Sequence, residues 1–369
     1  MNEKLQSLLK IKTTEKNQES NPLLFDLKDE EQADALLKLF ETGKISRVVD
    51  NYSEQVGELA LIKDPTLILK KKENATVGEG ELSDGNWIYY PWRQTLVHAV
   101  NQDDYEMVRL SRNDNFISST QQAEIKKKII AVAGLNVGNS GTVCMAQEGF
   151  NHLKLADLDI LALSNLNRFR AGLPEVEVDK TTITARQIYE INPYINLDIY
   201  HDGIKPENID QFLLEPKVDL LIEEIDNLKL KIALRQRARE LKIPVLMVTG
   251  NGSNIIIDVE RYDEDNTKPL LNGYLKEEVI DRINNVGSTT DFREKMALMR
   301  DFMGGEFLVK ELRESFDRVG IDLAGIPQLA EATFLRGASL AYFARKILIT
   351  KDVPSGRYKL ELDGIKKIG

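Results

Sequence analysis

The stretch KKIIAVAGLNVGNSGTVCMAQEGFNHLKLADLD, residues 127–159, decides the fold. An apolar run, Ile129–Ala133, leads into a glycine-punctuated turn, Gly134–Gly138, and a helix-compatible segment, Ser140–Glu148, follows. A second apolar run then ends at Asp157. Strand, tight turn, helix, strand and acid, in this order, are typical of a nucleotide-binding βαβ unit.

The turn and the acid carry the expected nucleotide contacts. A phosphate needs backbone N–H groups at a helix N-terminus, and glycine lets the backbone come close to it. We therefore expect Gly134, Asn136 and Gly138 to bind the nucleotide, and Asp157, 23 residues after Gly134, to reach its ribose. Asn136 stands where the second glycine of a G-x-G-x-x-G pattern would fall, and asparagine tolerates left-handed backbone best after glycine. Taken alone, the turn is also compatible with a structural loop that binds no nucleotide.

Composition limits the classes of protein and of partner. A chain of 369 residues can hold two or three domains at roughly 100–200 residues each. With 42% hydrophobic and 29% charged residues it reads as an ordinary globular protein. The net charge of −10 argues against a nucleic-acid partner and against an anionic membrane surface.

Targeting signals and cysteine usage favour a cytoplasmic location. The start Met-Asn-Glu-Lys lacks the apolar core of a signal peptide, and no window approaches the roughly 20 apolar residues of a membrane span. The single cysteine, Cys144, excludes an internal disulfide and any four-cysteine zinc site. We therefore expect no zinc and a reducing compartment.

The chain divides into three parts. Residues 1–103 are expected to form a small α+β module, in which an aromatic cluster around Trp87 forms the core or a binding face. A short helix is expected within residues 1–10, no structure at 11–22, and a loop at 73–85. Residues 104–262 alternate strands with helices after a linker at 105–115, and residues 263–369 read as a helical region that could serve as a lid or a dimer face.

The middle part is expected to be an α/β domain of Rossmann-like type. Alternating strands and helices predict a mostly parallel sheet with helices on both faces. Ligands bind beyond the carboxyl ends of such strands. Gly134, Asp157, Asp226 and Gly250 all fall at strand ends, and Lys126–Lys128 reads as a solvated entry to the first strand.

The polar residues that gather at these strand ends suit phosphate chemistry. They are Asp157, Asn165, Arg168, Lys180 and Asp226. Arginine and lysine neutralise phosphates and the charge that develops during transfer, and a carboxylate can hold Mg²⁺. Hydride transfer does not require this collection. Each charge alone would more often be a solvated surface group.

The string Asp157 to Arg168, D-L-D-I-L-A-L-S-N-L-N-R, together with Lys180 and the later I-D-N, resembles the ubiquitin-activating-like adenylating family (ThiF, MoeB and HesA enzymes). This family includes sulfur-carrier activating enzymes and peptide-adenylating microcin enzymes. The resemblance covers about residues 104–258. The segment Asn86–His98 is similar to the extra N-terminal module of bacterial members whose substrate is unassigned, some of which are fused to a nitroreductase domain.

The resemblance implies roles for single residues. Asp157 would bind the adenosine ribose, and we also expect Asp159 to contact the nucleotide. Asn165, Arg168 and Lys180 would hold the triphosphate of ATP, and Asp226 would bind Mg²⁺. Arg112 looks like the arginine that such enzymes lend to the partner's ATP site, which implies a homodimer.

The sequence also departs from the family pattern at several positions. Asn136 and Asn139 replace loop glycines, and the paired zinc cysteines are missing. Cys144 lies in the first helix after the turn, where we expect buried packing rather than a thioester-forming nucleophile.

The leading functional hypothesis is ATP-dependent adenylation of a carboxylate on a peptide or small protein. It belongs to peptide natural-product maturation or to sulfur-carrier-type activation, and the N-terminal module would clamp the peptide. Alternatives are ATP-driven dehydration or cyclisation of a peptide or a tRNA base, an NAD(P)- or flavin-linked oxidoreductase, and a non-catalytic nucleotide-binding protein of the same fold.

Overall fold

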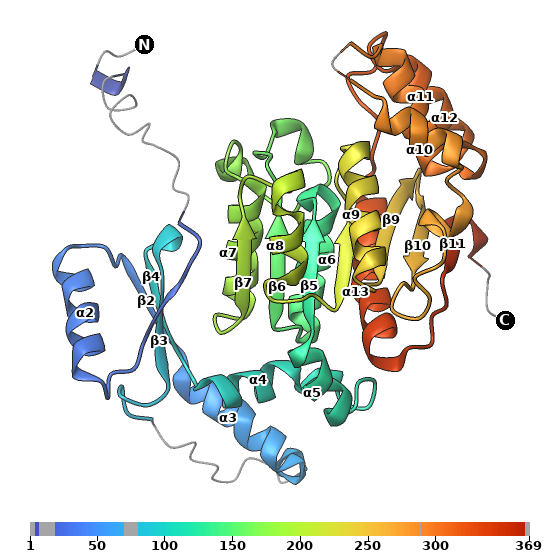
Figure 1. Ribbon diagram of the computed structural model, residues 1–369. Helices are drawn as coiled ribbons and strands as arrows, with labels where there is room; N and C mark the ends of the chain where they lie inside the picture. Colours follow the sequence, from blue (N-terminus) through green and yellow to red (C-terminus); the bar gives the residue numbers. More distant parts are fainter. Residues whose placement is uncertain (1–3, 7–18, 70–79, 288, 366–369) are drawn as a thin grey trace.

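The computed structural model describes residues 4–6, 19–69, 80–287 and 289–365 (Figure 1). The expectations for residues 1–10, 11–22 and 73–85 therefore lie wholly or partly outside the described residues. Within the described ranges, no helix has the length and apolar character needed to cross a bilayer.

A seven-stranded sheet with strand order β11-β10-β9-β8-β5-β6-β7 forms the centre of the larger body. The strands are β5 (Ile129–Ala133), β6 (His152–Ala156), β7 (Asn196–Tyr200), β8 (Leu220–Glu223), β9 (Val245–Asn251), β10 (Asn254–Glu260) and β11 (Gly356–Leu360). From β7 through β9 all neighbours pair in parallel, whereas β10 and β11 are added in antiparallel fashion. The predicted α/β class with a mostly parallel sheet is confirmed.

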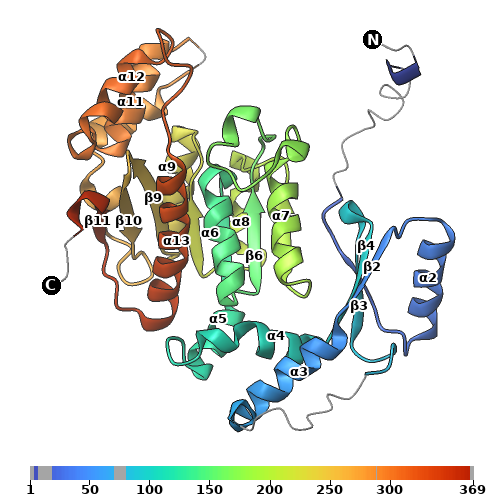
Figure 2. The ribbon, with the colours of Figure 1, turned by 180° about the vertical axis from the view of Figure 1, so that it is seen from behind.

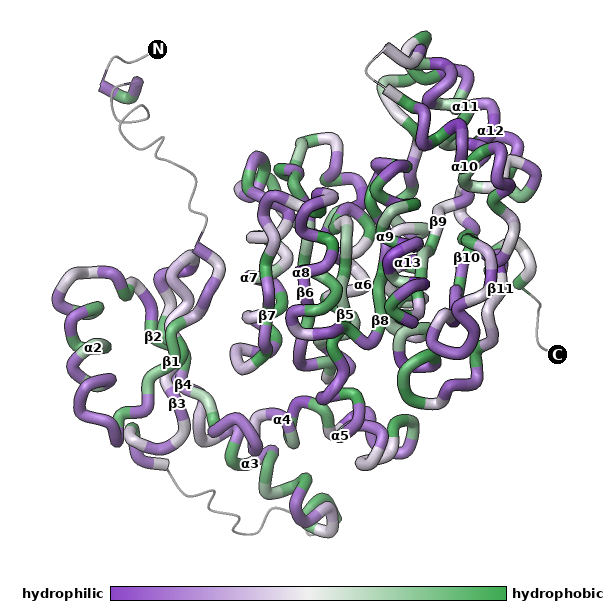
Figure 3. The backbone as a smooth tube through the Cα atoms, in the orientation of Figure 1, coloured by the Kyte–Doolittle hydropathy of each residue, from purple (hydrophilic) through white to green (hydrophobic). Residues whose placement is uncertain are grey.

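Helices cover both faces of this sheet (Figures 1 and 2). On one face lie α6 (Leu135–Glu148), α7 (Lys180–Ile191) and α13 (Ala330–Arg345), and on the other α8 (Ile209–Leu214) and α9 (Leu228–Glu240). Successive residues of β5 point to opposite faces, so Val132 joins the first core and Ala133 the second. Figure 3 shows β5 as an apolar segment, whereas the covering helices alternate between polar and apolar positions.

The N-terminal module is a separate small sheet with order β1-β3-β4-β2. Its elements are β1 (Leu23–Phe25), α2 (Glu30–Glu41), β2 (Arg47–Asp50), α3 (Tyr52–Lys63), β3 (Asn86–Tyr90) and β4 (Thr95–Ala99). The buried ring of Trp87 stacks on His98, and Tyr52 stacks on the same imidazole. The Trp87 ring therefore contributes to the module core, one of the two expectations for the aromatic cluster.

The segment expected as a linker is helical, which corrects the sequence interpretation. It contains α4 (Gln102–Leu110), followed after a turn by α5 (Ser119–Lys127). Asn101 caps α4 through the N–H of Asp104, and Ser118 caps α5 in a reciprocal pair with Gln121. Lys126, which lies in the last turn of α5 rather than at a strand entry, forms an ion pair with Glu106 of α4. The two helices are therefore fixed by local caps and by an ion pair that the apolar periodicity does not reveal.

The C-terminal region contains the four expected helices and an additional strand. Besides α13 these are α10 (Glu277–Asn284), α11 (Phe292–Met303) and α12 (Lys310–Arg318). The strand β11 forms the sheet edge next to β10, and its Arg357 pairs with the buried Asp258. The helix α13 packs closely on α6, because a Cβ added to Gly337 would lie 2.4 Å from the Cβ of Ser140. Residues beyond 262 thus complete the core of the nucleotide unit.

Candidate functional site

The strand order changes direction between β5 and β8. The chain runs outward from β5 through β6 to β7 and then returns to β8 on the other side of β5. The loops that follow β5 and β8 therefore diverge and leave a crevice, where ligands bind in open α/β sheets. Gly134 follows β5, and the segment from Glu224 to Asp226 follows β8.

Gly134 lets these two loops approach each other. Its φ is +91°, and a Cβ built on it would lie 2.5 Å from the carbonyl carbon of Glu224. Any other side chain would clash with that backbone, so only glycine fits at this position.

The helix α6 begins at Leu135 and not at Ser140, which corrects the predicted turn. Asn136 and Gly138 belong to its first turn, because the positive φ of Gly134 redirects the chain and the helix starts at once. A Cβ on Gly138 would lie 2.8 Å from Cγ1 of Val132, so this glycine allows close packing on β5. The expected phosphate loop is therefore the N-terminus of a helix, whose free N–H groups and dipole favour an anion.

Asp157 is held by the backbone around this helix start. Its Oδ2 accepts the Leu135 N–H at 2.6 Å, and its Oδ1 accepts the Asp159 N–H at 2.8 Å. Burial raises the pKa of the Asp157 carboxyl, while the nearby Lys180 opposes that change. Asp157 thus positions the turn, and its expected contact with a ribose stays a prediction.

Lys180 and Asp159 form an ion pair beside Asp157. The Lys180 Nζ lies 2.8 Å from Asp159 Oδ2, with the lysine almost wholly buried and the aspartate half exposed. The Lys180 N–H also donates to the Asp159 carbonyl oxygen at 3.0 Å. These three residues form one polar group at the carboxyl end of β6.

Asn165 and Arg168 come from the loop between β6 and α7. The Asn165 Oδ1 accepts the Ala162 N–H at 3.1 Å, which closes a short turn. The Arg168 Nη1 donates to the Ser164 carbonyl oxygen and to Asn167 Oδ1, while its Nε is buried and has no acceptor among the described residues. Burial lowers the pKa of Arg168, and Asp226 opposes this effect.

A cavity of about 480 Å³ opens at the crevice. Of the predicted site residues, it is lined by Asn136, Arg168 and Asp226, whereas Gly134, Gly138, Asp157, Asp159, Asn165 and Lys180 lie outside its lining. Its other charged lining residues are Glu224, Lys231 and Arg336. The remainder is largely apolar and comes from β9, α11, α12 and the segment that precedes α13.

Arg336 and Glu224 were missed by the sequence interpretation. Arg336 lies on α13, more than a hundred residues after the βαβ unit, among buried neighbours such as Ala332 and Leu340. A long cationic side chain on a helix face of small and apolar residues is the signal that could have identified it. Burial raises the pKa of Glu224 to about 7, and its Oε1 accepts the Val248 N–H at 2.6 Å.

Arg112 does not lie near the cavity of its own chain. It is exposed in the turn between α4 and α5 (Figure 1). The neighbouring Asn113 donates to the carbonyl oxygen of Glu148, the last residue of α6, whereas the cavity lies at the first turn of that helix. A whole helix length therefore separates Arg112 from the site.

The side chains at the cavity could hold Mg²⁺ only if a bound nucleotide supplied further oxygen ligands. No group of three histidine, cysteine, aspartate or glutamate side chains suited to a metal occurs in the described ranges. The exposed Asp226 makes no hydrogen bond or ion pair with any described residue. Mg²⁺ is commonly held by one or two carboxylates together with substrate phosphates, so Asp226 suits that arrangement.

Burial raises the pKa of the Cys144 thiol, which does not favour a nucleophilic thiolate.

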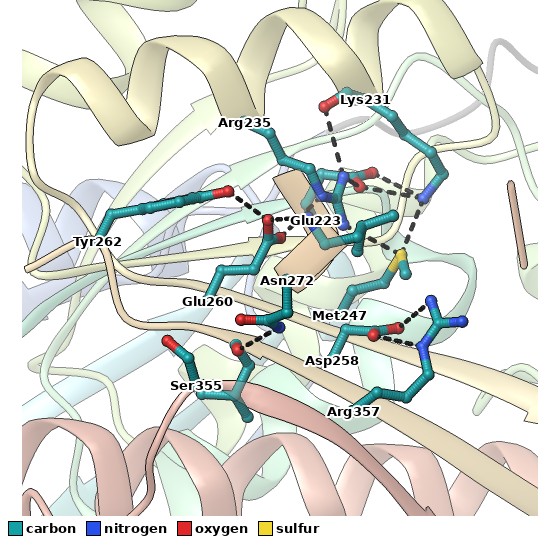
Figure 4. A network of polar contacts seen from close by, with 12 residues as sticks. Glu223, Lys231, Arg235, Met247, Asp258, Glu260, Tyr262, Asn272, Ser355 and Arg357 are labelled. Carbon is teal, nitrogen blue, oxygen red and sulfur yellow. Dashed lines mark hydrogen bonds and ion pairs between the residues drawn. The ribbon is translucent and has the colours of Figure 1, made fainter. Parts of the chain in front are cut away.

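An ionic network lies beneath the cavity (Figure 4). The Lys231 Nζ contacts both carboxylate oxygens of Glu223, at 2.9 and 3.1 Å. Arg235 pairs with Glu223 and, through Nε at 2.9 Å, with Glu260, which also accepts the Tyr262 hydroxyl. The network ties β8, α9 and β10 together, and Lys231 links it to the cavity wall.

Comparison with known proteins identifies the family. Residues 110–266 match the ThiF family. An uncharacterized Mycobacterium tuberculosis protein is 32% identical over 341 residues, which cover 91% of this chain and 45% of the relative. The molybdopterin-synthase adenylyltransferase of Haemophilus influenzae is 25% identical over 160 residues, 42% of this chain and 56% of that protein.

Further similarities concern a tRNA-modifying enzyme and its structure. The tRNA threonylcarbamoyladenosine dehydratase of Haemophilus influenzae is 29% identical over 152 residues, 41% of this chain and 58% of that protein. The Escherichia coli enzyme structure matches with a TM-score of 0.48 at 19% identity, covering 68% of this chain and 97% of that chain. The chain spans about half the length of the curated relatives it matches.

Residues 110–266 of this chain form a ThiF family domain. The expected family resemblance is confirmed.

Proposed function

We propose that the cavity binds ATP with Mg²⁺ and that the protein adenylates a carboxylate on a peptide or small protein. The observation that carries this proposal is the convergence, at one crevice of a ThiF domain, of the α6 N-terminus with Arg168 and Asp226. A helix N-terminus and an arginine suit phosphates, and an acid without a partner suits their metal. The names of relatives, a molybdopterin-synthase adenylyltransferase and ubiquitin-like modifier-activating enzymes, support the same chemistry.

The reaction has a simple electron balance. A carboxylate oxygen of the substrate attacks the α-phosphorus of ATP and forms a new P–O bond. The bond from that phosphorus to the bridging oxygen breaks, and pyrophosphate leaves with the bonding electrons. The product is an acyl-adenylate. Mg²⁺, when bound, would neutralise charge on the triphosphate, and Asp226 would hold it.

The residues of the chain would contribute electrostatic stabilisation. Fixed N–H groups and a guanidinium directed at developing charge act without reorganisation during the reaction. Arg168 lines the cavity, and its Nη2 makes no hydrogen bond with the described residues, so it can take up a phosphate oxygen. Lys180, Asp159, Asp157 and Asn165 form the neighbouring side, where we expect the ribose and the remaining phosphates.

The alternatives use these groups less well. An NAD(P)- or flavin-linked oxidoreductase would give no role to Arg168 and Asp226, and a non-catalytic binder would need only the helix N-terminus. Dehydration or cyclisation driven by ATP shares the adenylation step and differs only in the later fate of the adenylate.

A cytoplasmic location belongs to the proposal, because ATP and a reducing environment are both available there. Maturation of a peptide natural product and activation of a sulfur carrier are the two biological settings that this chemistry suits.

Two measurements test the proposal. ATP with Mg²⁺ should raise the thermal midpoint of the protein through binding to the folded state, whereas NAD and FAD should not. Pyrophosphate release in the presence of a peptide mixture should then separate an enzyme from a binder. Stabilisation by NAD alone would contradict the proposal.

Arg168→Ala is expected to lower turnover more than ATP binding. A guanidinium at the α-phosphate gains most when charge builds in the transition state, so the loss should be about 2–4 kcal/mol of transition-state stabilisation. Arg170→Ala, which removes an exposed arginine two residues away, serves as the control. Measured kcat and ATP dissociation constants distinguish the two effects, and an unchanged kcat would leave Arg168 as a structural side chain.

We also propose a two-fold homodimer in which Arg112 completes the partner's ATP site. Support comes from its exposure and its distance, one helix length, from its own cavity. Two-fold dimers are the commonest oligomers of soluble proteins. Mixing Arg112→Ala chains with Asp226→Ala chains should then recover about a quarter of the wild-type activity, because half of random dimers are mixed and each has one complete site. A monomer in sedimentation, or no recovery on mixing, would contradict this assembly.

A further inference from the structure

Arg336 is a buried cation that forms no ion pair with a carboxylate of the described residues. Only 6% of the residue is exposed, on the cavity wall. Its Nη2 donates to Thr333 Oγ1 at 2.9 Å and to Gln328 Oε1 at 3.1 Å, while its Nε is buried and has no acceptor among the described residues. A guanidinium keeps its proton in proteins, and a buried charge normally has a counterion. Its Nη1 also makes no hydrogen bond with the described residues, so the guanidinium favours an anionic ligand.

The acids near Arg336 do not supply that counterion. Neither Glu224 nor Asp226 lies within ion-pair distance of it in the described structure, although both attract its charge. Glu224 accepts the Val248 N–H, and its raised pKa of about 7 leaves it only partly ionised at neutral pH. Arg168 on the same wall adds a second positive charge. The part of the cavity lined by Arg168 and Arg336 thus favours the binding of more than one anionic group.

Gly250 makes room for the guanidinium. A Cβ on Gly250 would lie 3.3 Å from Cζ of Arg336, so a side chain there would press against the cation. Gly250 is the second-last residue of β9 and lines the cavity. The backbone of the sheet thereby leaves the face of Arg336 open at the crevice.

Another part of the cavity lining is apolar and adaptable. It consists of Phe292, Met296, Met299, Phe302, Met303, Leu312 and Phe316, the methionine chamber. The ring of Phe302 lies over the Lys231 ammonium at 5.4 Å and the Arg235 guanidinium at 5.6 Å, so it shields the ionic network from the chamber. Methionine side chains are flexible and polarizable, and they adjust to irregular apolar groups.

We propose that Arg336 binds the carboxylate of the acyl substrate and that the methionine chamber takes an apolar side chain at the substrate's C-terminus. The substrate class is then a peptide or small protein that ends in a bulky apolar residue, rather than in two glycines. The inference rests on the proposed adenylation. Arg168 and Arg336 line one cavity, so the first can hold the α-phosphate while the second presents the attacking carboxylate.

Three tripeptides provide the probes. They are Ala-Gly-Phe as the free acid, the same peptide with a C-terminal amide, and Ala-Gly-Gly as the free acid. Binding is measured by calorimetry and by saturation-transfer NMR with the α,β-methylene analogue of ATP and Mg²⁺ present, because this analogue cannot release pyrophosphate. Binding of the analogue itself is measured first.

The wild-type protein should bind the Ala-Gly-Phe acid at least about tenfold more tightly than its amide, since a charge-assisted hydrogen bond is lost on capping. It should prefer the same acid to Ala-Gly-Gly by a similar factor, because the chamber removes the ring from water. In Arg336→Gln the preference for acid over amide should disappear, whereas affinity for the amide should stay unchanged. Met299→Gln should reduce the preference for phenylalanine over glycine without affecting the difference between acid and amide.

Arg345→Gln is the matched control. Arg345 lies on the same helix but outside the cavity lining, where it pairs with Glu148 at 3.2 Å. This variant should keep both preferences. Thermal melts of all variants establish that they are folded.

Several outcomes would overturn the inference. They are equal binding of acid and amide, equal binding of the two free acids, or no binding of any peptide at millimolar concentration while the analogue is bound. A loss of analogue affinity in Arg336→Gln with unchanged peptide affinity would make Arg336 a phosphate ligand instead. Failure of the wild type to bind the analogue would instead contradict the proposed adenylation.

Discussion

Asp226→Ala is expected to abolish ATP-dependent pyrophosphate release while the fold stays intact. The side chain is exposed at the crevice and makes no hydrogen bond or ion pair with the described residues. Its removal therefore takes away a metal ligand and no packing. The rate should fall by on the order of a thousandfold, the size seen when a preorganised electrostatic group is removed. The thermal midpoint should stay close to that of the wild type, because surface substitutions change stability little.

Pyrophosphate exchange measures this effect, and Asp202→Ala is the control. Asp202 is also exposed, follows the edge strand β7 of the same sheet, and is absent from the cavity lining. It should exchange at the wild-type rate. Titration with Mg²⁺ adds a second readout, since Asp226→Ala should need far more metal than the control. Normal exchange in Asp226→Ala would remove the metal role assigned to this residue.

The local part of the site could be read from the sequence. Arg168 and Asp226 were expected at strand ends, and both line the cavity. This was possible because Asp226 comes three residues after β8 and Arg168 lies in the loop that leaves β6. The parallel order of the strands brings the segments that follow them to one edge of the sheet. The same reasoning placed Asn136 directly after β5, and there it lines the cavity, although in the first turn of α6 and not in a loop.

Features that depend on contacts between residues far apart in the sequence could not be predicted from the sequence alone. The start of α6 depends on the positive φ of Gly134 and on Asp157 accepting the Leu135 N–H, a contact across 22 positions. The strand β11 lies in the region expected to be helical, and it is held at the sheet edge by pairing with β10 and by the ion pair of Arg357 with Asp258. Arg336 reaches the cavity only because α13 packs against α6, which apolar periodicity does not predict.

The buried network beneath the cavity is the other feature that periodicity conceals. Glu223, Arg235 and Glu260 are each at most 1% exposed. From the sequence alone, these three residues would be assigned to the solvent-facing polar positions of two strands and a helix. Their charges are tolerated only because each acid has a cationic partner inside the protein. The floor of the cavity is therefore rigid as long as the network is complete.

Arg235→Ala is expected to lower the free energy of unfolding by about 3–5 kcal/mol, because removing one partner of a buried ion pair leaves an uncompensated charge. Glu223 would keep Lys231, but Glu260 would keep only the Tyr262 hydroxyl and the Leu271 N–H. Urea unfolding followed by circular dichroism measures the change. The matched control is Arg237→Ala on the same helix, whose exposed pairs with Asp210 and Glu240 should matter little.

The loss in Arg235→Ala should also depend on pH. Burial already raises the pKa of Glu260, and without Arg235 that pKa should rise further. The folded pKa of such a carboxyl exceeds its unfolded value of about 4.3, so between these two values the folded state binds more protons than the unfolded chain. The free energy of unfolding therefore falls as the pH rises through this range. The unfolded chain titrates alike in the variant and the wild type, so the deficit should grow only between the folded pKa of Glu260 in the wild type and its higher folded pKa in the variant. A deficit that is constant between acid and neutral pH would show that lost packing, and not the unpaired charge of Glu260, destabilises the variant.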